Sequence, residues 1–149
     1  MNNCAEKGGI MKKIIIAIIL CVVFSSPCYA YRFAEKWTKA DTMYQGLFLA
    51  ITTVDYLQTR TCAKNNWKMN GQGYYESNPF MSRYPSVREV DTLIPLAMLG
   101  HTFVSMALPP KATLFGIKCS PRRTWQLIWI GIETGYVVSN YSVGVRIEF

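Results

Sequence analysis

The 149-residue chain has little charge and almost no histidine, since charged residues make up 17% of it and His101 is its single histidine. One histidine excludes metal sites that need two or more imidazoles. The sequence also lacks the serine-hydrolase elbow, the phosphate-binding loop, the dinucleotide fingerprint and the zinc-protease motif. Half of the residues are apolar, which excludes a disordered chain, and the length fits one domain. The sequence therefore describes a small apolar protein without a familiar enzyme motif.

The N-terminus has the pattern of a secretory signal. Lys12 and Lys13 precede an apolar run at 14–24, which is followed by Ser-Ser-Pro and then by Ala30. The run is shorter than the roughly 18–20 residues that a helix needs to cross a bilayer, so we expect cleavage after Ala30 rather than a retained anchor. Residues 1–30 are thus predicted to be an upstream extension and signal peptide, and residues 31–149 a single exported domain.

Cysteine usage agrees with export. Cys62 and Cys119 lie in the predicted exported domain, and the sequence contains no Cys-x-x-Cys. That absence excludes a thioredoxin-like redox centre and a cysteine zinc knuckle. In an oxidising compartment Cys62 and Cys119 are a disulfide candidate, whereas three membrane crossings would place them on opposite sides. Two separate buried thiols are the alternative.

Basic side chains outnumber acidic ones by 16 to 9, but they are spread over the loops. An exported protein rarely meets DNA, so we expect no nucleic-acid partner. Attraction to anionic lipid head groups is the better interpretation of the positive charge.

Three apolar blocks predict helices, at Asp41 to about Cys62, at Thr92 to Leu108 and at Thr124 to about Asn140. Polar residues of the first block recur at helical spacing and predict one polar stripe: Asp41, Gln45, Thr52, Asp55 and Thr59. A loop of about thirty residues, rich in Asn, Gly, Tyr and Pro, separates the first two blocks. The predicted fold is mainly α, a small bundle of about three apolar helices with a short extended C-terminal tail.

These blocks are also candidate membrane spans. Their apolar cores of about 14 to 17 residues lie between the lengths of buried helices and of transmembrane helices. The third block begins with Trp125 and Trp129, as membrane helices often do. Its Gly131 and Gly135 are predicted to pack against a neighbouring helix. We expect an inner-membrane protein, with a soluble periplasmic bundle as the alternative, although the basic loop at 111–123 opposes the positive-inside tendency for an exported N-terminus.

Ionisable residues inside these blocks are the candidate site. His101 and Glu133 lie near the middles of the second and third blocks, so an antiparallel pair would place them at the same depth. Asp55 on the first block and Glu76 in the long loop complete the set. Ionisable groups within apolar helices suggest function, and one imidazole with carboxylates suits a proton relay or a divalent metal. We assign no metal site, because no His-x-x-x-His or Glu-x-x-His pair is present. A hydrogen-bonded polar core that fixes helix register is the alternative.

Several short motifs carry a resemblance. Asp55 with Gln58-Thr59-Arg60, Glu76-x-Asn78-Pro79, and then His101, Glu133 and Asn140 resemble small bacterial and prophage-encoded membrane or exported proteins of unknown function. The resemblance implies that these polar positions belong to one site, and it brings no activity with it.

From these observations we expect a small cell-envelope protein of structural or interaction type. Its expected partners are membrane lipid and an envelope protein, and its cofactor is unknown. One alternative is a membrane-embedded hydrolase or metal-dependent enzyme that uses His101, Glu133 and Asp55. Another is a phage-type lysis or superinfection-exclusion factor.

Overall fold

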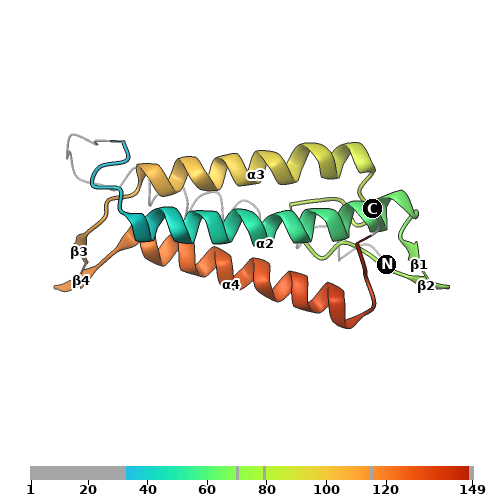
Figure 1. Cartoon of the computed structure of the whole chain (residues 1–149). Coiled ribbons are helices and arrows are strands. Elements are labelled where there is room, and N and C mark those ends of the chain that lie inside the picture. Colours follow the sequence, from blue (N-terminus) through green and yellow to red (C-terminus); the bar gives the residue numbers. More distant parts are fainter. Residues whose placement is uncertain (1–32, 70, 79, 115, 148–149) are drawn as a thin grey trace, which may run out of the picture.

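The computed structural model describes residues 33–69, 71–78, 80–114 and 116–147. The predicted signal sequence and the cleavage after Ala30 lie outside these residues. Three helices pack side by side: α2 (Lys39–Lys64), α3 (Val87–Ala107) and α4 (Pro121–Ser142). In Figure 1, α3 runs antiparallel to both α2 and α4. The prediction of a mainly α fold with about three helices is confirmed.

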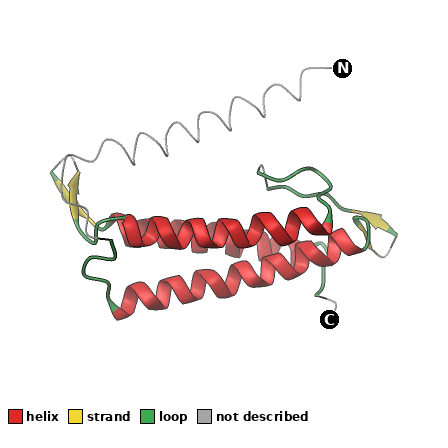
Figure 2. Cartoon of the chain, turned by 90° about the horizontal axis from the view of Figure 1, so that it is seen from above, coloured by secondary structure: helices red, strands yellow, loops and turns green. Residues whose placement is uncertain are grey.

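Two short hairpins mark the ends of the bundle. Strand β1 (Lys68–Met69) pairs antiparallel with β2 (Gln72–Gly73), and β3 (Ala112–Leu114) pairs antiparallel with β4 (Ile117–Cys119). Figures 1 and 2 show the two hairpins at opposite ends of the bundle, the β1–β2 end and the β3–β4 end. The sequence did not predict the hairpins, because strands of two or three residues are too short to show an alternating pattern.

Local sequence explains where the helices begin. Thr38 and Asp41 form a capping box at the start of α2, in which the Asp41 amide donates to the Thr38 hydroxyl at 3.2 Å and the Thr38 amide donates to the Asp41 carboxylate at 2.8 Å. Ser86 accepts from the Glu89 amide at 3.2 Å and caps α3. Pro121 occupies the first turn of α4. Because of the Ser86 cap, α3 begins about one turn before its apolar block.

The bundle buries mainly polar side chains and exposes apolar ones. Its buried polar and charged residues are Asp41, Gln45, Thr52, Gln58, Thr59, Thr61, His101, Ser105, Arg122, Gln126 and Glu133. Large apolar side chains that are exposed along α3 and α4 are Leu96, Leu99, Phe103, Leu127, Ile128, Ile132 and Val138. Helices of a bundle in water normally show the opposite distribution.

One helix among the described residues, α3, is long and apolar enough to cross a bilayer by length and composition, and most of its apolar window is exposed. The expected packing of Gly131 and Gly135 against a neighbouring helix of this chain is wrong. Both glycines are exposed, and a Cβ atom added to either would meet nothing within 4 Å. Glu133, between them, turns inward instead.

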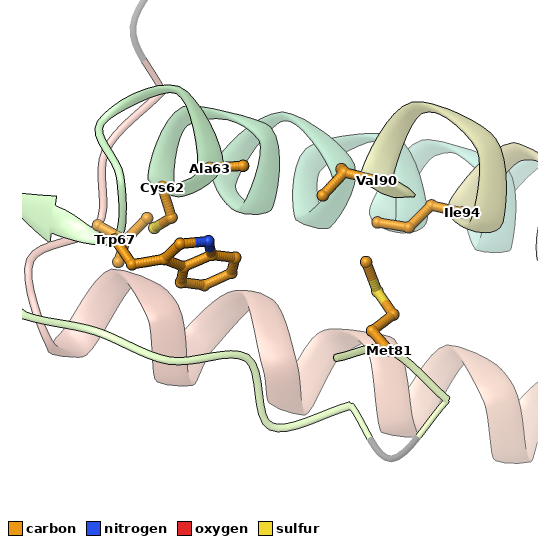
Figure 3. Close-up of a cluster of buried hydrophobic side chains, with 7 residues drawn as sticks. Cys62, Ala63, Trp67, Met81, Val90 and Ile94 are labelled. Atoms are coloured by element: carbon orange, nitrogen blue, oxygen red, sulfur yellow. The ribbon is translucent and has the colours of Figure 1, made fainter. Parts of the chain in front are cut away.

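A small apolar cluster closes the β1–β2 end. It comprises Cys62, Ala63, Trp67, Met81, Val90, Ile94 and Val145, most of which Figure 3 labels. The Trp67 indole N–H donates to the Pro85 carbonyl at 3.0 Å. These contacts hold the long loop and the C-terminal segment against the ends of α2 and α3.

No disulfide joins the two cysteines of the described chain. Cys62 lies in the last turn of α2 at the β1–β2 end, whereas Cys119 ends β4 at the β3–β4 end. The candidate disulfide is therefore not formed, because the length of the bundle separates the two residues.

Candidate functional site

Three carboxyl groups from different segments gather in the half of the bundle nearer the β1–β2 end. Asp55 comes from α2, Glu76 from the loop after β2, and Glu133 from α4. The Asp55 carboxyl interacts electrostatically with those of Glu133 and Glu76, and Glu133 also interacts with Glu76. The structure thus brings together three of the four residues that the sequence suggested.

Asn140 connects this acidic cluster across two helices. Its side-chain amide donates to Asp55 Oδ1 at 3.0 Å and to Gln58 Oε1 at 3.4 Å. In the loop, the Asn78 backbone amide donates to Glu76 Oε1 at 2.7 Å and so fixes the backbone between Glu76 and Asn78. The motif that begins at Asp55 and the motif that begins at Glu76 therefore both contribute residues to the acidic cluster.

The acidic cluster has no basic partner among the described residues. Their ion pairs are Glu35–Lys36, Asp91–Arg60, Asp41–Arg122 and Asp41–Arg123, none of which includes a cluster carboxyl. The described residues also contain no group of three His, Cys, Asp or Glu side chains placed to hold a metal ion. Like charges close together are unfavourable unless a proton or a cation balances them. The described residues supply no such cation.

A cavity of about 370 Å³ adjoins the cluster. It is lined by residues of α2, the β1–β2 hairpin and following loop, α4 and the C-terminal segment: Thr59, Cys62, Trp67, Gln72, Gly73, Tyr74, Tyr75, Glu76, Ser77, Ser139, Asn140, Val143 and Val145. Glu76 belongs to both the cavity wall and the acidic cluster, and Asn140, which donates to Asp55, also lines the cavity. The Tyr74 hydroxyl donates to the Val143 carbonyl at 2.9 Å and holds the C-terminal wall in place.

Thr59 is an unusual member of the cavity wall. The residue is 4% exposed, and no hydrogen bond joins its hydroxyl to a described residue, but its Oγ1 is not among the fully buried polar atoms that lack a partner. On the same helix, the hydroxyl groups of Thr53 and Thr61 donate to carbonyls one turn earlier, at 2.7 Å and 2.9 Å. The Thr59 hydroxyl is therefore accessible from the cavity, where it can accept a hydrogen bond from a bound molecule.

His101 lies in a separate, aromatic environment. Its ring stacks on Phe48 with centroids 3.6 Å apart and on Trp125 at 5.5 Å, and it meets the edge of Trp129 at 6.3 Å. Its Nδ1 is 3.3 Å from the Gln45 amide nitrogen, and its buried Nε2 has no hydrogen-bonding partner in the described structure.

The suggested pairing of His101 with Glu133 is therefore not formed. His101 on the antiparallel α3 lies against the turns of α4 that carry Trp125 and Trp129, and Glu133 is one turn further along. The four candidate residues thus divide into the acidic cluster and a single stacked histidine.

A third polar centre, at the β3–β4 end, was missed by the sequence analysis. Arg122 Nη1 lies 3.5 Å from Asp41 Oδ2, and its Nε donates to the carbonyls of Ser105 at 3.0 Å and Leu108 at 3.1 Å. Its Nη2 donates to the Glu35 carbonyl at 3.0 Å. The sequence placed Arg122 in a basic loop, although Asp41 on the predicted polar stripe already indicated an inward-facing acid that needed a partner.

Comparisons with known proteins do not assign the chain to a family. No family model, no curated protein and no solved structure matches it. The resemblance to small bacterial and prophage-encoded proteins therefore stays a prediction, and the geometry of the polar residues is the basis for assigning a function.

Proposed function

We propose that the chain is an integral membrane protein of the cell envelope, of structural or interaction type, whose three helices cross the bilayer with polar side chains turned inward. The observation that carries this proposal is the inverted distribution of side chains. Leu99 is 69% exposed in the middle of α3, whereas Gln126 on α4 is completely buried. Lipid covers apolar side chains, and polar groups within a bilayer face the bundle interior and one another.

Helix length supports the same proposal. The three helices have 26, 21 and 22 residues, and about 20 residues cross the ~30 Å hydrocarbon core. α2 and α4 are less apolar than α3 because each contributes an inward polar stripe. In water, the exposed side chains of Leu96, Leu99 and Phe103 would form an apolar surface that favours aggregation.

The exposed basic side chains agree with this placement. Those at the β3–β4 end are Lys36, Lys39, Lys111, Lys118 and Arg123, and those at the β1–β2 end are Lys64, Lys68, Arg83, Arg88 and Arg146. The outer surface around the middle of the bundle has no exposed basic side chain among the described residues. Two basic ends match the anionic head groups on the two surfaces of a membrane.

Carbonate extraction of membranes that contain the full chain tests the proposal, with two lysine substitutions as a matched pair. Leu99 and Ile117 are equally exposed, at 69% and 71%, but Leu99 is in the centre of α3 and Ile117 is in the β3–β4 hairpin. A lysine at the centre of a membrane helix costs about 2.5–3.5 kcal/mol of insertion free energy. We expect the wild type and Ile117→Lys to resist carbonate and Leu99→Lys to lose much of the resistant fraction.

A soluble wild type, or equal behaviour of Leu99→Lys and Ile117→Lys, would contradict membrane insertion. In a soluble bundle both positions face water, so a lysine at either would be harmless.

The geometry gives less support to a hydrolase that uses His101, Glu133 and Asp55 together. A general base must lie within hydrogen-bonding distance of its partner or of the substrate proton. His101 is instead enclosed by Phe48 and Trp125, and it makes no hydrogen bond to either carboxyl. A lysis or superinfection-exclusion role stays a prediction from size and export.

A further inference from the structure

We propose that the cavity at the β1–β2 end is a binding site for a small protonated amine. Its volume of about 370 Å³ lies within the roughly 300–1,000 Å³ of small-molecule sites. The cavity is formed mainly by the hairpin, the following loop and the ends of α2 and α4. Binding there does not require the helices to cross a bilayer, so this proposal and the proposed membrane function can fail independently.

The charges around the cavity indicate that the ligand is a cation. Glu76 is the one charged residue in the cavity wall, and the Asp55 and Glu133 carboxyls interact with it electrostatically. The ion pairs of the described residues leave all three carboxyls without a basic partner. A cation bound at Glu76 would be attracted by all three carboxyls, whereas an anionic ligand would be repelled by them.

Hydrogen-bonding capacity favours an ammonium group over a metal ion. An ammonium has three donors and no acceptor. Glu76 uses Oε1 for the Asn78 amide, and its Oε2 makes no hydrogen bond with the described residues. The Thr59 hydroxyl, which is accessible from the cavity, supplies a second acceptor in the same wall. The described carboxyls do not form a group that could hold a metal ion.

Aromatic walls suit the organic part of such a ligand. Trp67 and Tyr74 line the cavity, and aromatic faces attract cations and bury alkyl chains. The third aromatic residue, Tyr75, already has the Arg83 guanidinium 4.9 Å from its ring centroid. Trp67 has the Tyr84 ring 6.5 Å away in an edge contact, and Tyr74 has no ring or guanidinium contact with a described residue, so Tyr74 is the main ring for the ligand.

Isothermal titration calorimetry of the full chain in detergent micelles, with empty micelles as the blank, tests the site. The probes are n-butylammonium, the neutral 1-butanol, tetramethylammonium and Ca²⁺. We expect saturable binding of n-butylammonium, and binding weaker by about tenfold or more for 1-butanol, which lacks the charge. Tetramethylammonium, which has the charge but no N–H donor, should also bind more weakly. Equal binding of 1-butanol, or tighter binding of Ca²⁺, would overturn the proposal.

Glu76→Gln and Thr59→Val identify the residues responsible, and Glu35→Gln is the control. Glutamine keeps the acceptor for Asn78 but removes the charge, and valine keeps the shape of threonine without the hydroxyl. Glu35 is an acid at the opposite end, paired only with the exposed Lys36 at 3.8 Å. We expect Glu76→Gln to weaken n-butylammonium binding about tenfold, Thr59→Val to weaken it less, and Glu35→Gln to leave it unchanged.

Unfolding temperatures separate loss of the site from loss of the fold. If Glu76→Gln unfolds, Thr59→Val still tests the cavity. Unchanged affinity in a folded Glu76→Gln or Thr59→Val variant would place the amine elsewhere and overturn the proposal.

Discussion

The Arg122 guanidinium and the Asp41 carboxylate form an ion pair that is almost completely buried, with side chains 1% and 3% exposed and the charged atoms 3.5 Å apart. The pair connects the first turns of α2 and α4. Arg122 also donates to carbonyls at the C-terminal end of α3, which have no partner within their own helix. One side chain therefore joins all three helices at the β3–β4 end, where a soluble bundle would use apolar contacts.

Replacing Arg122 should strongly destabilise the bundle. Arg122→Met leaves the Asp41 carboxylate buried beside a single, half-exposed arginine, and removing one partner of a buried pair costs about 3–5 kcal/mol. Arg123 also lies 3.5 Å from Asp41, but its side chain is 47% exposed. Arg123→Gln should therefore cost less than about 1 kcal/mol. Thermal unfolding in detergent, followed by circular dichroism, measures the stability of both variants. Equal losses of stability would show that the buried Arg122 contributes no more than the half-exposed Arg123.

His101 should be replaceable by another flat ring. His101→Phe keeps the stacking with Phe48 and Trp125, and the Gln45 amide still has the Thr102 hydroxyl at 2.9 Å as a partner. We expect a change in unfolding free energy of within about 1 kcal/mol for His101→Phe and a loss of about 2–4 kcal/mol for His101→Ala, which leaves a void. Greater loss in His101→Phe than in His101→Ala would indicate that the imidazole nitrogens, rather than the ring stack, carry its role.

Neutralising the acidic cluster should stabilise the fold. Asp55→Asn keeps the Oδ1 atom that accepts from Asn140 but removes one of the three interacting acidic groups. We expect unfolding free energy to rise by about 1 kcal/mol in the absence of amine. The control is Asp91→Asn, which should lower stability slightly because Asp91 accepts from Arg60 and Tyr56, both at 2.8 Å. A destabilised Asp55→Asn would mean that the cluster is held together by contacts that need the charge.

Helical periodicity predicted the elements and the inward stripe of α2, because both are properties of neighbouring residues. Of the stripe, Asp41, Gln45, Thr52 and Thr59 are buried, and Asp55 joins the acidic cluster. The capped start of α3 at Ser86 is less visible, since the residues between the cap and the apolar block are polar and charged.

The division of the candidate residues was not predictable from one sequence. Two residues at the middles of neighbouring blocks meet only if the helices also have the right rotation and offset, which tertiary packing sets. In this bundle the offset brings Trp125 and Trp129 to His101. The same offset places Glu133 in the acidic cluster with Asp55 and Glu76. Arg122 was assigned to a loop because its partners come from three distant segments.

The most direct test of the proposal that the helices cross the membrane is to determine which side of the membrane each end of the bundle faces. Lys68 in β1 and Lys118 in β4 are both exposed, at opposite ends. Lys68→Cys and Lys118→Cys are made separately in chains whose native cysteines are replaced, and intact cells or spheroplasts are treated with a membrane-impermeant maleimide. A membrane-spanning bundle predicts that one of the two positions is labelled at once and the other only after the membrane is permeabilised. Labelling of both positions without permeabilisation, or of neither, would contradict it.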